Sequence, residues 1–206
     1  MANTNPRSSA RRTQAQRRAE TQKQLLDAGR ALFVSQGVAR TGLPEIVQKA
    51  GVTRGALYHH FEDKADLFRA IAEREAIAIS ELINARTDAI EDPNEAMMVG
   101  TDAYFDAMLV PGRAKILLAD APSILGHRAA QDLTRSEGSE TLRFGLARAI
   151  PQAKEQDIEA LTNVLSAAFD RAALEISQGG DRTAFTKALL MMIERLLAPL
   201  TNRDTA

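Results

Sequence analysis

Residues 50–61, AGVTRGALYHHF, gather several side chains that can do chemistry within a short span. His59 and His60 follow an arginine and a tyrosine, so the stretch is a metal site, a piece of core or a surface that contacts a partner. Neighbouring side chains on a helix point about 100° apart, whereas two helical ligands of one ion normally lie four residues apart. The remaining histidine, His127, is far along the chain. We therefore expect no metal and no cofactor.

A core position explains only part of this stretch. Leu57 and Phe61 are four residues apart and would face inward, with Val52 in the preceding turn. The other residues are small, polar or planar, which makes poor core material but suits close contact with a flat, grooved, charged partner. They are Thr53, Arg54, Gly55, Ala56, Tyr58 and His59.

Two short helices joined by a tight glycine turn, after a longer supporting helix, are typical of a helix-turn-helix. The second helix can enter the DNA major groove, where Gly55 and Ala56 would let the backbone approach the groove floor. Arg54 can bind a guanine edge, and Tyr58 offers its ring to a thymine methyl group and its hydroxyl to a phosphate. Phosphate contacts are expected from His59 or His60 and from Lys64. The alternative is an ordinary helical hairpin.

The elements that must position these residues are helices, because no long window alternates with period two. Gly37 and Gly51 are expected as stops, Thr53 and Asp63 as N-caps, and Pro122 as a break. The expected helices cover 13–36, 43–50, 53–60, 63–92, 94–109, 113–120, 127–150 and 153–177, and a last one starts at 181. The chain is therefore predicted to be all-α, with about nine helices.

Charge divides the chain near residue 64. Residues 1–64 hold 11 Lys and Arg against 5 Asp and Glu, a net charge of +6, whereas residues 65–206 hold 15 against 22, a net charge of −7. A basic first third indicates that only this end meets a polyanion. We expect a disordered basic arm at 1–12, a helix-turn-helix DNA-binding domain at 13–64 and a second helical domain at 65–206.

Composition limits the other classes of protein. The chain has no cysteine, so a disulfide, a thiolate metal site and a cysteine nucleophile are impossible. No apolar run approaches the ~20 residues of a membrane span, and the N-terminus lacks the apolar stretch of a secretory signal. A cytoplasmic protein without a membrane partner is expected. An enzyme of helical fold is disfavoured because no phosphate loop or nucleophile motif is present.

The stretches LLDAGRALFVSQG (25–37) and EIVQKAGVTRGALYHHFEDKADLF (45–68) carry a specific resemblance. Residues 19–79 resemble the N-terminal DNA-binding domain of the TetR family of transcriptional regulators, with the helix-turn-helix at 42–61. The resemblance implies that the recognition helix reads DNA, that His60 and Lys64 hold phosphates, and that Thr41 and Gly42 start the supporting helix at the DNA backbone. The expected DNA-contacting set is Thr41, Gly42, Thr53, Arg54, Gly55, Ala56, Tyr58, His59, His60 and Lys64.

Two residues depart from the family pattern. Gly42 stands where the family usually has a Ser or Thr cap, and Pro44 stands where a polar residue often reaches DNA. We expect weaker phosphate contacts from this helix. Basic residues before and within the first helix can compensate by reaching the DNA backbone or minor groove; they are Arg11, Arg12, Arg17 and Arg18.

The last two predicted helices carry apolar residues three and four apart, which suits an antiparallel pair. Two copies can form a four-helix bundle across a two-fold axis, as in similar proteins. The expected homodimer interface is Leu161, Leu165, Ala168, Ala172, Phe185, Leu189, Met192 and Leu196. The alternative is that these residues fill the core of a single chain.

The resemblance also implies a small-molecule pocket among the middle helices, so that 65–206 is the regulatory and dimerisation domain. Aromatic and methionine side chains make adaptable apolar walls, although each can equally be core. The apolar candidates are Tyr104, Phe105, Met108, Phe144 and Phe169. The polar candidates that would orient a ligand are Asp120, His127 and Asp170.

Together these patterns predict a ligand-responsive transcriptional regulator that binds a palindromic double-stranded DNA operator as a homodimer. Repression is the usual mode of similar proteins. A small-molecule effector would tilt the helix that starts at Asp63, with a switch around residues 113–125, and so release the DNA. Two alternatives stay open: a helical adaptor that binds an acidic protein, and an enzyme of helical fold.

Overall fold

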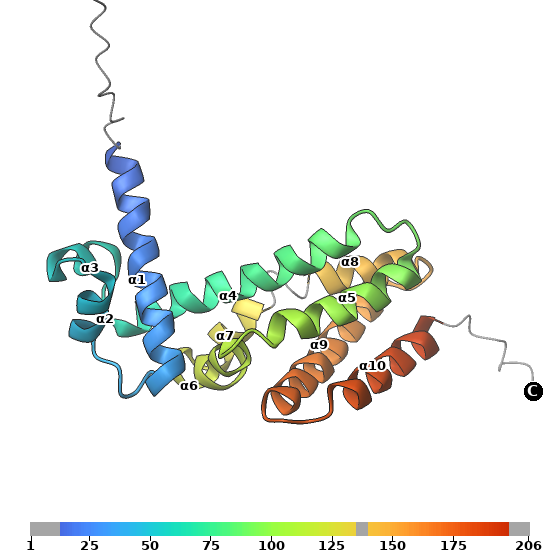
Figure 1. Ribbon diagram of the computed structural model, residues 1–206. Coiled ribbons are helices and arrows are strands. Elements are labelled where there is room, and N and C mark those ends of the chain that lie inside the picture. The colour runs from blue at the N-terminus through green and yellow to red at the C-terminus, as the bar shows by residue number, and fades with distance from the viewer. Residues whose placement is uncertain (1–12, 135–139, 198–206) are drawn as a thin grey trace, which may run out of the picture. The chain divides into compact units, whose positions relative to one another are not determined.

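The computed structural model describes residues 13–134 and 140–197 and divides into two compact units, residues 1–68 and 69–206 (Figure 1). Its described residues form ten α-helices and one π-helix, and they include no strand. The all-α prediction is confirmed. The predicted basic arm at 1–12 lies outside the described residues.

The first unit contains the three helices that the sequence predicted. They are α1 (Gln14–Gln36), α2 (Leu43–Ala50) and α3 (Arg54–His60). Thr13 caps α1, and the Thr53 side chain caps α3 by accepting the Ala56 N–H at 3.1 Å. Gly51 ends α2 with a φ of 67°, a left-handed conformation that glycine adopts without strain. The fully buried side chains of this unit are Leu25, Phe33, Ile46, Leu57, Leu67 and Phe68.

Helix α4 (Lys64–Thr87) begins in the first unit and continues into the second. Asp63 accepts the Asp66 N–H at 2.8 Å at its start, as predicted for an N-cap. The helix ends at Thr87, five residues before the predicted end at 92. Asp92 instead caps the next helix by accepting the Asn94 N–H at 2.9 Å, and a residue before proline avoids the helical conformation.

The second unit adds α5 (Pro93–Met108), α9 (Glu155–Ser177) and α10 (Arg182–Leu197) as its long helices. Shorter segments lie between them: the π-helix η1 (Lys115–Asp120), α6 (Ala121–Leu125), α7 (His127–Thr134) and α8 (Glu140–Ala149). The structure describes two helices within 127–150, which was predicted as one helix, and residues 135–139 between them lie outside the described residues.

The break that the sequence predicted at Pro122 takes an unexpected form. Pro122 lies in the first turn of α6, which follows η1 directly, and Asp120 and Ala121 keep helical backbone angles. Proline lacks an N–H and clashes with the carbonyl four residues before it. Just ahead of it, the Ala121 N–H donates to the Ile116 carbonyl five residues back, which is the π-helical pattern. The helix widens at this point instead of stopping.

Candidate nucleic-acid interface and ligand cavity

Helix α3 presents the face that the sequence assigned to DNA. Leu57 is fully buried and Phe61 is 4% exposed, so these two side chains fix the helix to its unit. Thr53, Arg54, Gly55, Tyr58 and His59 are exposed, and Ala56 and His60 are half-buried. The predicted division into an inner and an outer face is confirmed.

Arg54 and Tyr58 form a pair on this outer face. The Arg54 guanidinium lies 5.5 Å from the centroid of the Tyr58 ring, and its Nη2 atom is 3.5 Å from the Tyr58 hydroxyl oxygen. Residues four apart on a helix are neighbours, and a guanidinium over an aromatic face is an attractive arrangement. A planar donor and a planar ring thus share one side of the helix.

Two histidines and an arginine gather at the C-terminal end of α3. The His59 and His60 rings are 5.6 Å apart, edge to face. Partial burial lowers the pKa of His60 below its ordinary value, and the positive charges of Arg18 and His59 add to the effect. Neighbouring positive charge at the surface is what a phosphate backbone would bind.

Thr41 and Lys64 support the turn between α1 and α2. Thr41 is 1% exposed, and its hydroxyl donates to the Gly37 carbonyl at 2.8 Å. The Lys64 ammonium donates to the Val38 carbonyl at 2.9 Å and to the Thr41 carbonyl at 3.1 Å. The predicted DNA contact of the Thr41 side chain does not fit this burial. Lys64 keeps one further N–H, since an ammonium has three donors.

The start of α2 is held by a residue that the sequence reading missed. The Gly42 N–H donates to Glu45 Oε2 at 3.2 Å, and the same oxygen accepts a hydrogen bond from Gln36 Nε2 at 3.0 Å. The available signal was the acidic residue three positions after the N-cap, which is half of a capping box. The Gly42 N–H is therefore engaged by a carboxylate of its own chain.

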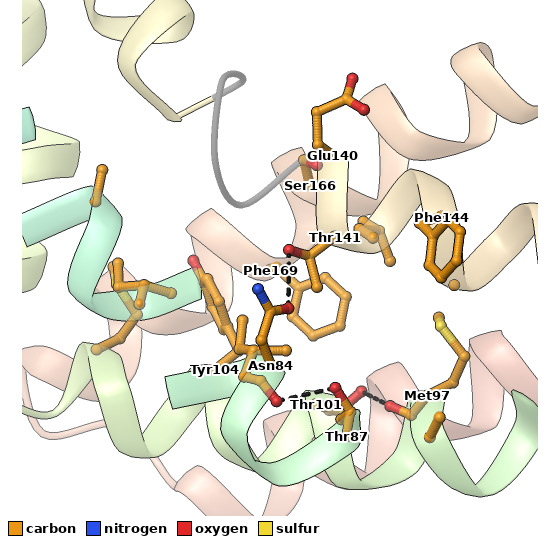
Figure 2. A pocket seen from close by; sticks show the side chains of 18 of the residues that line it. Asn84, Thr87, Met97, Thr101, Tyr104, Glu140, Thr141, Phe144, Ser166 and Phe169 are labelled. Atoms are coloured by element: carbon orange, nitrogen blue, oxygen red, sulfur yellow. Dashed lines mark hydrogen bonds between the residues drawn. The ribbon is translucent and has the colours of Figure 1, made fainter. Parts of the chain in front are cut away.

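A cavity of about 510 Å³ lies in the second unit, with walls from α4, α5, η1, α8 and α9. Figure 2 shows Tyr104, Phe169, Thr101 and Met97 around it. The volume is within the range of small-molecule sites, about 300–1,000 Å³. Five of the eight predicted ligand residues line it: Tyr104, Met108, Phe144, Phe169 and Asp170.

The other three predicted ligand residues lie elsewhere. Phe105 is 1% exposed and packs in the core, 6.0 Å from the Phe169 ring between centroids. Asp120 is paired with Lys115 at 2.6 Å across η1. His127 is exposed at the start of α7 and is not part of the lining.

Tyr104 and Asp170 join two walls of the cavity through a part-buried hydrogen bond. The Tyr104 hydroxyl donates to Asp170 Oδ1 at 2.9 Å. Burial raises the pKa of Tyr104 well above its ordinary value, and the nearby carboxylate raises it further. Burial also raises the pKa of Asp170, and the hydrogen bond from Tyr104 opposes that shift.

The face of α4 that lines the cavity was also missed from the sequence. Ala76, Ile79, Ile83 and Thr87 recur three and four positions apart, and all four are lining residues. This spacing could have predicted the lining, because it places the four side chains on one face of the helix.

A buried ion pair connects α4 with the segment before η1. Arg113 Nε donates to Glu75 Oε2 at 2.8 Å, and Arg113 Nη1 donates to the Ala107 carbonyl at 2.8 Å. Both side chains are buried. Leu117 and Leu118 of the adjoining η1 line the cavity, so the cavity wall and the ion pair belong to one short stretch of chain.

The predicted dimer residues divide between the inside and the outside of the chain. Leu165, Ala172 and Leu189 are buried in the chain's own core, whereas Leu161, Ala168 and Phe185 are half-buried. Met192 and Leu196 are 45% and 38% exposed. Val164 on α9 and Met191 on α10, which were not predicted, are the more exposed apolar side chains at 62% and 56%.

In the parts of the chain that the structure describes, no group of three or more acidic or histidine side chains is placed to hold a metal ion. No helix over residues 13–134 and 140–197 has the length and apolar character to cross a membrane.

Known proteins match both units. Residues 25–71 match the family model for "Bacterial regulatory proteins, tetR family", and residues 94–200 match the model for "Tetracyclin repressor-like, C-terminal domain". The chain is 51% identical over 73 residues to the HTH-type transcriptional regulator AcrR of Shigella flexneri, covering 35% of this chain and 34% of AcrR. It is 50% identical over 64 residues to the HTH-type transcriptional repressor BepR of Brucella suis, covering 31% and 30%. The chain thus spans about a third of the length of these curated relatives.

A solved structure matches over nearly the whole chain. It is a TetR-family transcriptional regulator from Pectobacterium atrosepticum, with 33% sequence identity, a TM-score of 0.69, and coverage of 90% of this chain and 96% of that one. Proteins of this family are DNA-binding transcription factors and not enzymes, in agreement with the helix-turn-helix and the outward face of α3. The chain belongs to the TetR family of bacterial transcriptional regulators.

Proposed function

We propose that the chain is a repressor that binds a palindromic operator as a homodimer and is released when a small molecule occupies the cavity of the second unit. The observation that carries the proposal is the separation of two features. A polar recognition face lies on α3, and an apolar cavity lies among other helices of the same chain. The similar protein BepR is a transcriptional repressor by name, which supports repression as the mode of regulation.

The DNA contacts are assigned to the exposed residues of α3 and its surroundings. Arg54 and Tyr58 read bases, and Thr53, Gly55 and Ala56 allow the close approach. His59, His60 and the remaining N–H of Lys64 bind phosphates. Gly42 donates no backbone hydrogen bond to DNA, since its N–H is engaged by Glu45, and it only allows close approach of the backbone. Thr41 is left out of this set because its side chain is buried.

The route from effector to DNA runs through η1. A ligand against Leu117 and Leu118 displaces this π-helix, and Arg113, two residues before it, passes the displacement to Glu75 of α4 through their ion pair. Helix α4 begins with Lys64, which holds the turn before α2. The effector shifts the equilibrium only by its differential affinity for the two arrangements. A π-helical turn is a frequent feature of such functional positions.

We assign the homodimer contact to the outer faces of α9 and α10. Val164, Met191, Met192 and Leu196 are exposed apolar side chains on these two helices. Apolar area that stays exposed in one chain is buried when a two-fold axis places the same surface of a second copy against it. Leu161, Ala168 and Phe185 border this surface. The dimer sets two copies of α3 one DNA turn apart, or a multiple of it.

Selection of bound fragments from random duplex DNA tests the proposal. We expect an inverted repeat to be recovered by the wild-type protein. Arg54→Ala and Tyr58→Ala should lose the preferred sequence, whereas Arg128→Ala, which removes the same charge as Arg54→Ala from an exposed position in the second unit, should keep it. Recovery of no sequence, or of the same sequence by all four proteins, would refute the assignment.

A further inference from the structure

Three hydroxyl groups that line the cavity donate their protons to partners within the chain. The Thr101 hydroxyl donates to the Met97 carbonyl at 2.8 Å, and the Thr87 hydroxyl donates to the Ile83 carbonyl at 2.9 Å. The Tyr104 hydroxyl donates to Asp170. A hydroxyl has one proton and two lone pairs, so each of these groups has its donor engaged and keeps acceptor capacity.

Asp170 extends this pattern with a carboxylate. Over the described ranges, the Tyr104 hydroxyl is its one polar partner, and no lysine or arginine side chain pairs with it. Two carboxylate oxygens can accept more hydrogen bonds than one phenol supplies. A carboxylate that is largely removed from water and lacks a cation is costly, and this desolvation raises the pKa of Asp170.

The charged residues around Asp170 do not supply the missing cation. The lining contains three carboxylates, those of Asp88, Glu140 and Asp170, and one guanidinium, that of Arg148. Arg148 is exposed, its Nη2 atom donates to the Glu91 carbonyl at 3.0 Å, and its guanidinium lies 5.9 Å from the Phe144 ring centroid. It is therefore held at the mouth of the cavity.

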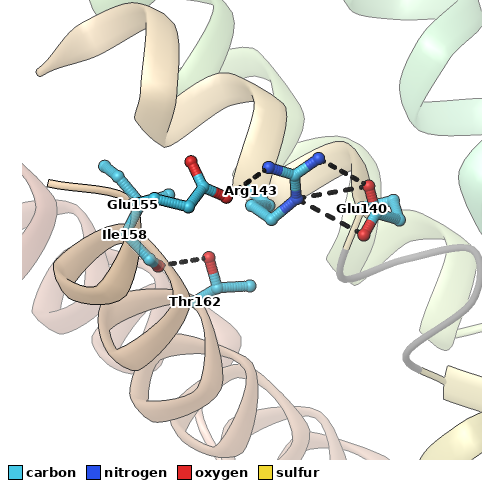
Figure 3. Close-up of polar contacts among 5 residues, drawn as sticks. All are labelled: Glu140, Arg143, Glu155, Ile158 and Thr162. Carbon is cyan, nitrogen blue, oxygen red and sulfur yellow. Dashed lines mark hydrogen bonds and ion pairs between the residues drawn. The ribbon is translucent and has the colours of Figure 1, made fainter. Parts of the chain in front are cut away.

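Glu140 is also engaged at the mouth. Arg143 lies between Glu140 and Glu155 and bonds both carboxylates, at 3.1 and 2.9 Å (Figure 3). Asp88 is exposed to solvent. Asp170 is thus the carboxylate of the lining that is at least half-buried and has no cationic partner within the described chain.

Aromatic rings complete the surroundings of Asp170. The Tyr104 and Phe169 rings are 5.2 Å apart between centroids and meet nearly edge to face. Both line the cavity, together with Met97 and Phe144 (Figure 2). Aromatic faces attract cations and bury apolar groups, so they suit a ligand that has both.

We propose that the effector is a hydrophobic organic cation, an aromatic compound with one protonated amine, and that its ammonium group binds the Asp170 carboxylate. The ammonium supplies the donors and the charge that this end of the cavity lacks, and the aromatic part fills the apolar remainder. The inference rests on the proposed ligand-binding function of the second unit. The competing explanation is that Asp170 only ties α9 to α5 through Tyr104.

Three isosteric probes test the class of ligand: naphthalen-2-ylmethylamine, naphthalen-2-ylmethanol and 2-naphthoate. They are a cation, a neutral compound and an anion at neutral pH. The chain has no tryptophan, so naphthyl fluorescence can be followed directly in titrations of the full-length protein. We expect the amine to bind about 10-fold or more tightly than the alcohol, and the carboxylate to bind most weakly.

Matched variants identify the group responsible. Asp170→Asn keeps the shape and can still accept from Tyr104, and it should lower amine affinity about 10- to 100-fold while the alcohol changes less than about 3-fold. Asp88→Asn removes the same charge from the exposed mouth and should change amine affinity less than about 3-fold. Circular dichroism checks that both variants are folded.

Tyr104→Phe gives a second readout if Asp170→Asn does not fold. Amine binding needs ionised Asp170, so affinity falls as the pH is lowered through the pKa of this carboxyl. Loss of the phenol hydrogen bond raises that pKa further. The fall in amine affinity should therefore begin at a higher pH in Tyr104→Phe than in the wild type, and the alcohol should show no such shift.

The outcomes separate the two levels of the proposal. Equal binding of amine and alcohol by the wild type, or an unchanged preference in Asp170→Asn, would overturn the cationic class and leave the cavity a ligand site. Failure of all three probes to bind would overturn both the class and the proposed ligand-binding function. Preference for the amine that disappears in Asp170→Asn and survives in Asp88→Asn supports the inference.

Discussion

The two units of the protein use their ionisable groups in opposite ways. The first unit turns Arg54 and His59 outward to solvent, whereas the second unit buries Arg113 with Glu75 and places Asp170 against a cavity. Exposed charges act over a distance and are screened by salt, while buried charges act by contact and are screened much less. This difference is the basis for the proposal that the first unit binds a polyanion and the second a small molecule.

Salt gives the largest expected contrast between the units. If the dimer makes about six or more phosphate contacts, operator affinity should fall about 10³-fold or more between 50 and 200 mM salt. Binding of an amine probe at Asp170 should change little over the same range. Fluorescence anisotropy with labelled DNA and probe titration measure the two dependences. A flat response for DNA would contradict the phosphate contacts of the first unit.

The buried ion pair gives the next largest effect. Arg113→Met removes the guanidinium from Glu75 and should lower the free energy of unfolding by about 3–5 kcal/mol. The control is Arg86→Met, because Arg86 pairs with Asp106 at a more exposed position. Loss of this pair should lower the free energy of unfolding by about 1 kcal/mol or less. Urea unfolding measures both. Equal effects would mean that burial does not distinguish these pairs.

The interface prediction distinguishes outer from inner apolar residues of the second unit. Val164→Glu, at a 62% exposed position, should leave the chain folded but shift it from dimer to monomer. Leu189→Glu, at a 4% exposed position, should lower the free energy of unfolding of the second unit by about 2–5 kcal/mol. Light scattering and circular dichroism measure the two properties. A folded dimer of Val164→Glu would place the interface elsewhere.

Base recognition tests the outer face of α3 residue by residue. Arg54→Ala should cost about 1–3 kcal/mol at one base pair and relax the preference there. Lys64→Ala should weaken all sequences alike and also destabilise the turn that its ammonium holds. Binding to a set of single-base operator variants checks the difference. Uniform weakening by Arg54→Ala would make this residue a phosphate contact.

The smallest expected effect is the pH dependence of DNA binding. Phosphate favours the protonated form of His60, whose pKa in the free protein lies below 6.5. DNA binding therefore takes up a proton, and affinity should rise several-fold as the pH falls through that region. His60→Gln should have a flatter profile than the wild type. Identical profiles would remove His60 from the contacts.

The outer and inner faces of α3 could be predicted because one short pattern determines both. Leu57 and Phe61 have to be buried, and Tyr58 and His59 are then turned outward by the helical period. No equivalent constraint exists in the second unit. Phe105 and Phe169 are the same residue type on neighbouring helices, yet Phe105 is core and Phe169 lines the cavity. Periodicity finds buried positions but does not distinguish a packed neighbour from an empty space.

Long-range pairs explain the other differences from the prediction. The partner of Asp170 is 66 positions away, and the Arg113–Glu75 pair spans 38 positions. A sequence pattern contains no information on such pairing without a tertiary arrangement. The sequence predicted the Thr53 cap and the Gly51 turn correctly, because each depends only on residues next to it in the chain.

The widened turn at η1 has a consequence for insertion and deletion. A π-turn contains one residue more than the α-turn that it replaces, so its simplest origin is a single inserted residue. A homologue one residue shorter between Arg113 and Gly126 would wind this stretch as an ordinary α-helix. Its side chains at the positions of Leu117 and Leu118 would then turn by about 100° relative to the residues after them. A change of one codon would thus reshape the wall of the cavity while the rest of the helix kept its sequence.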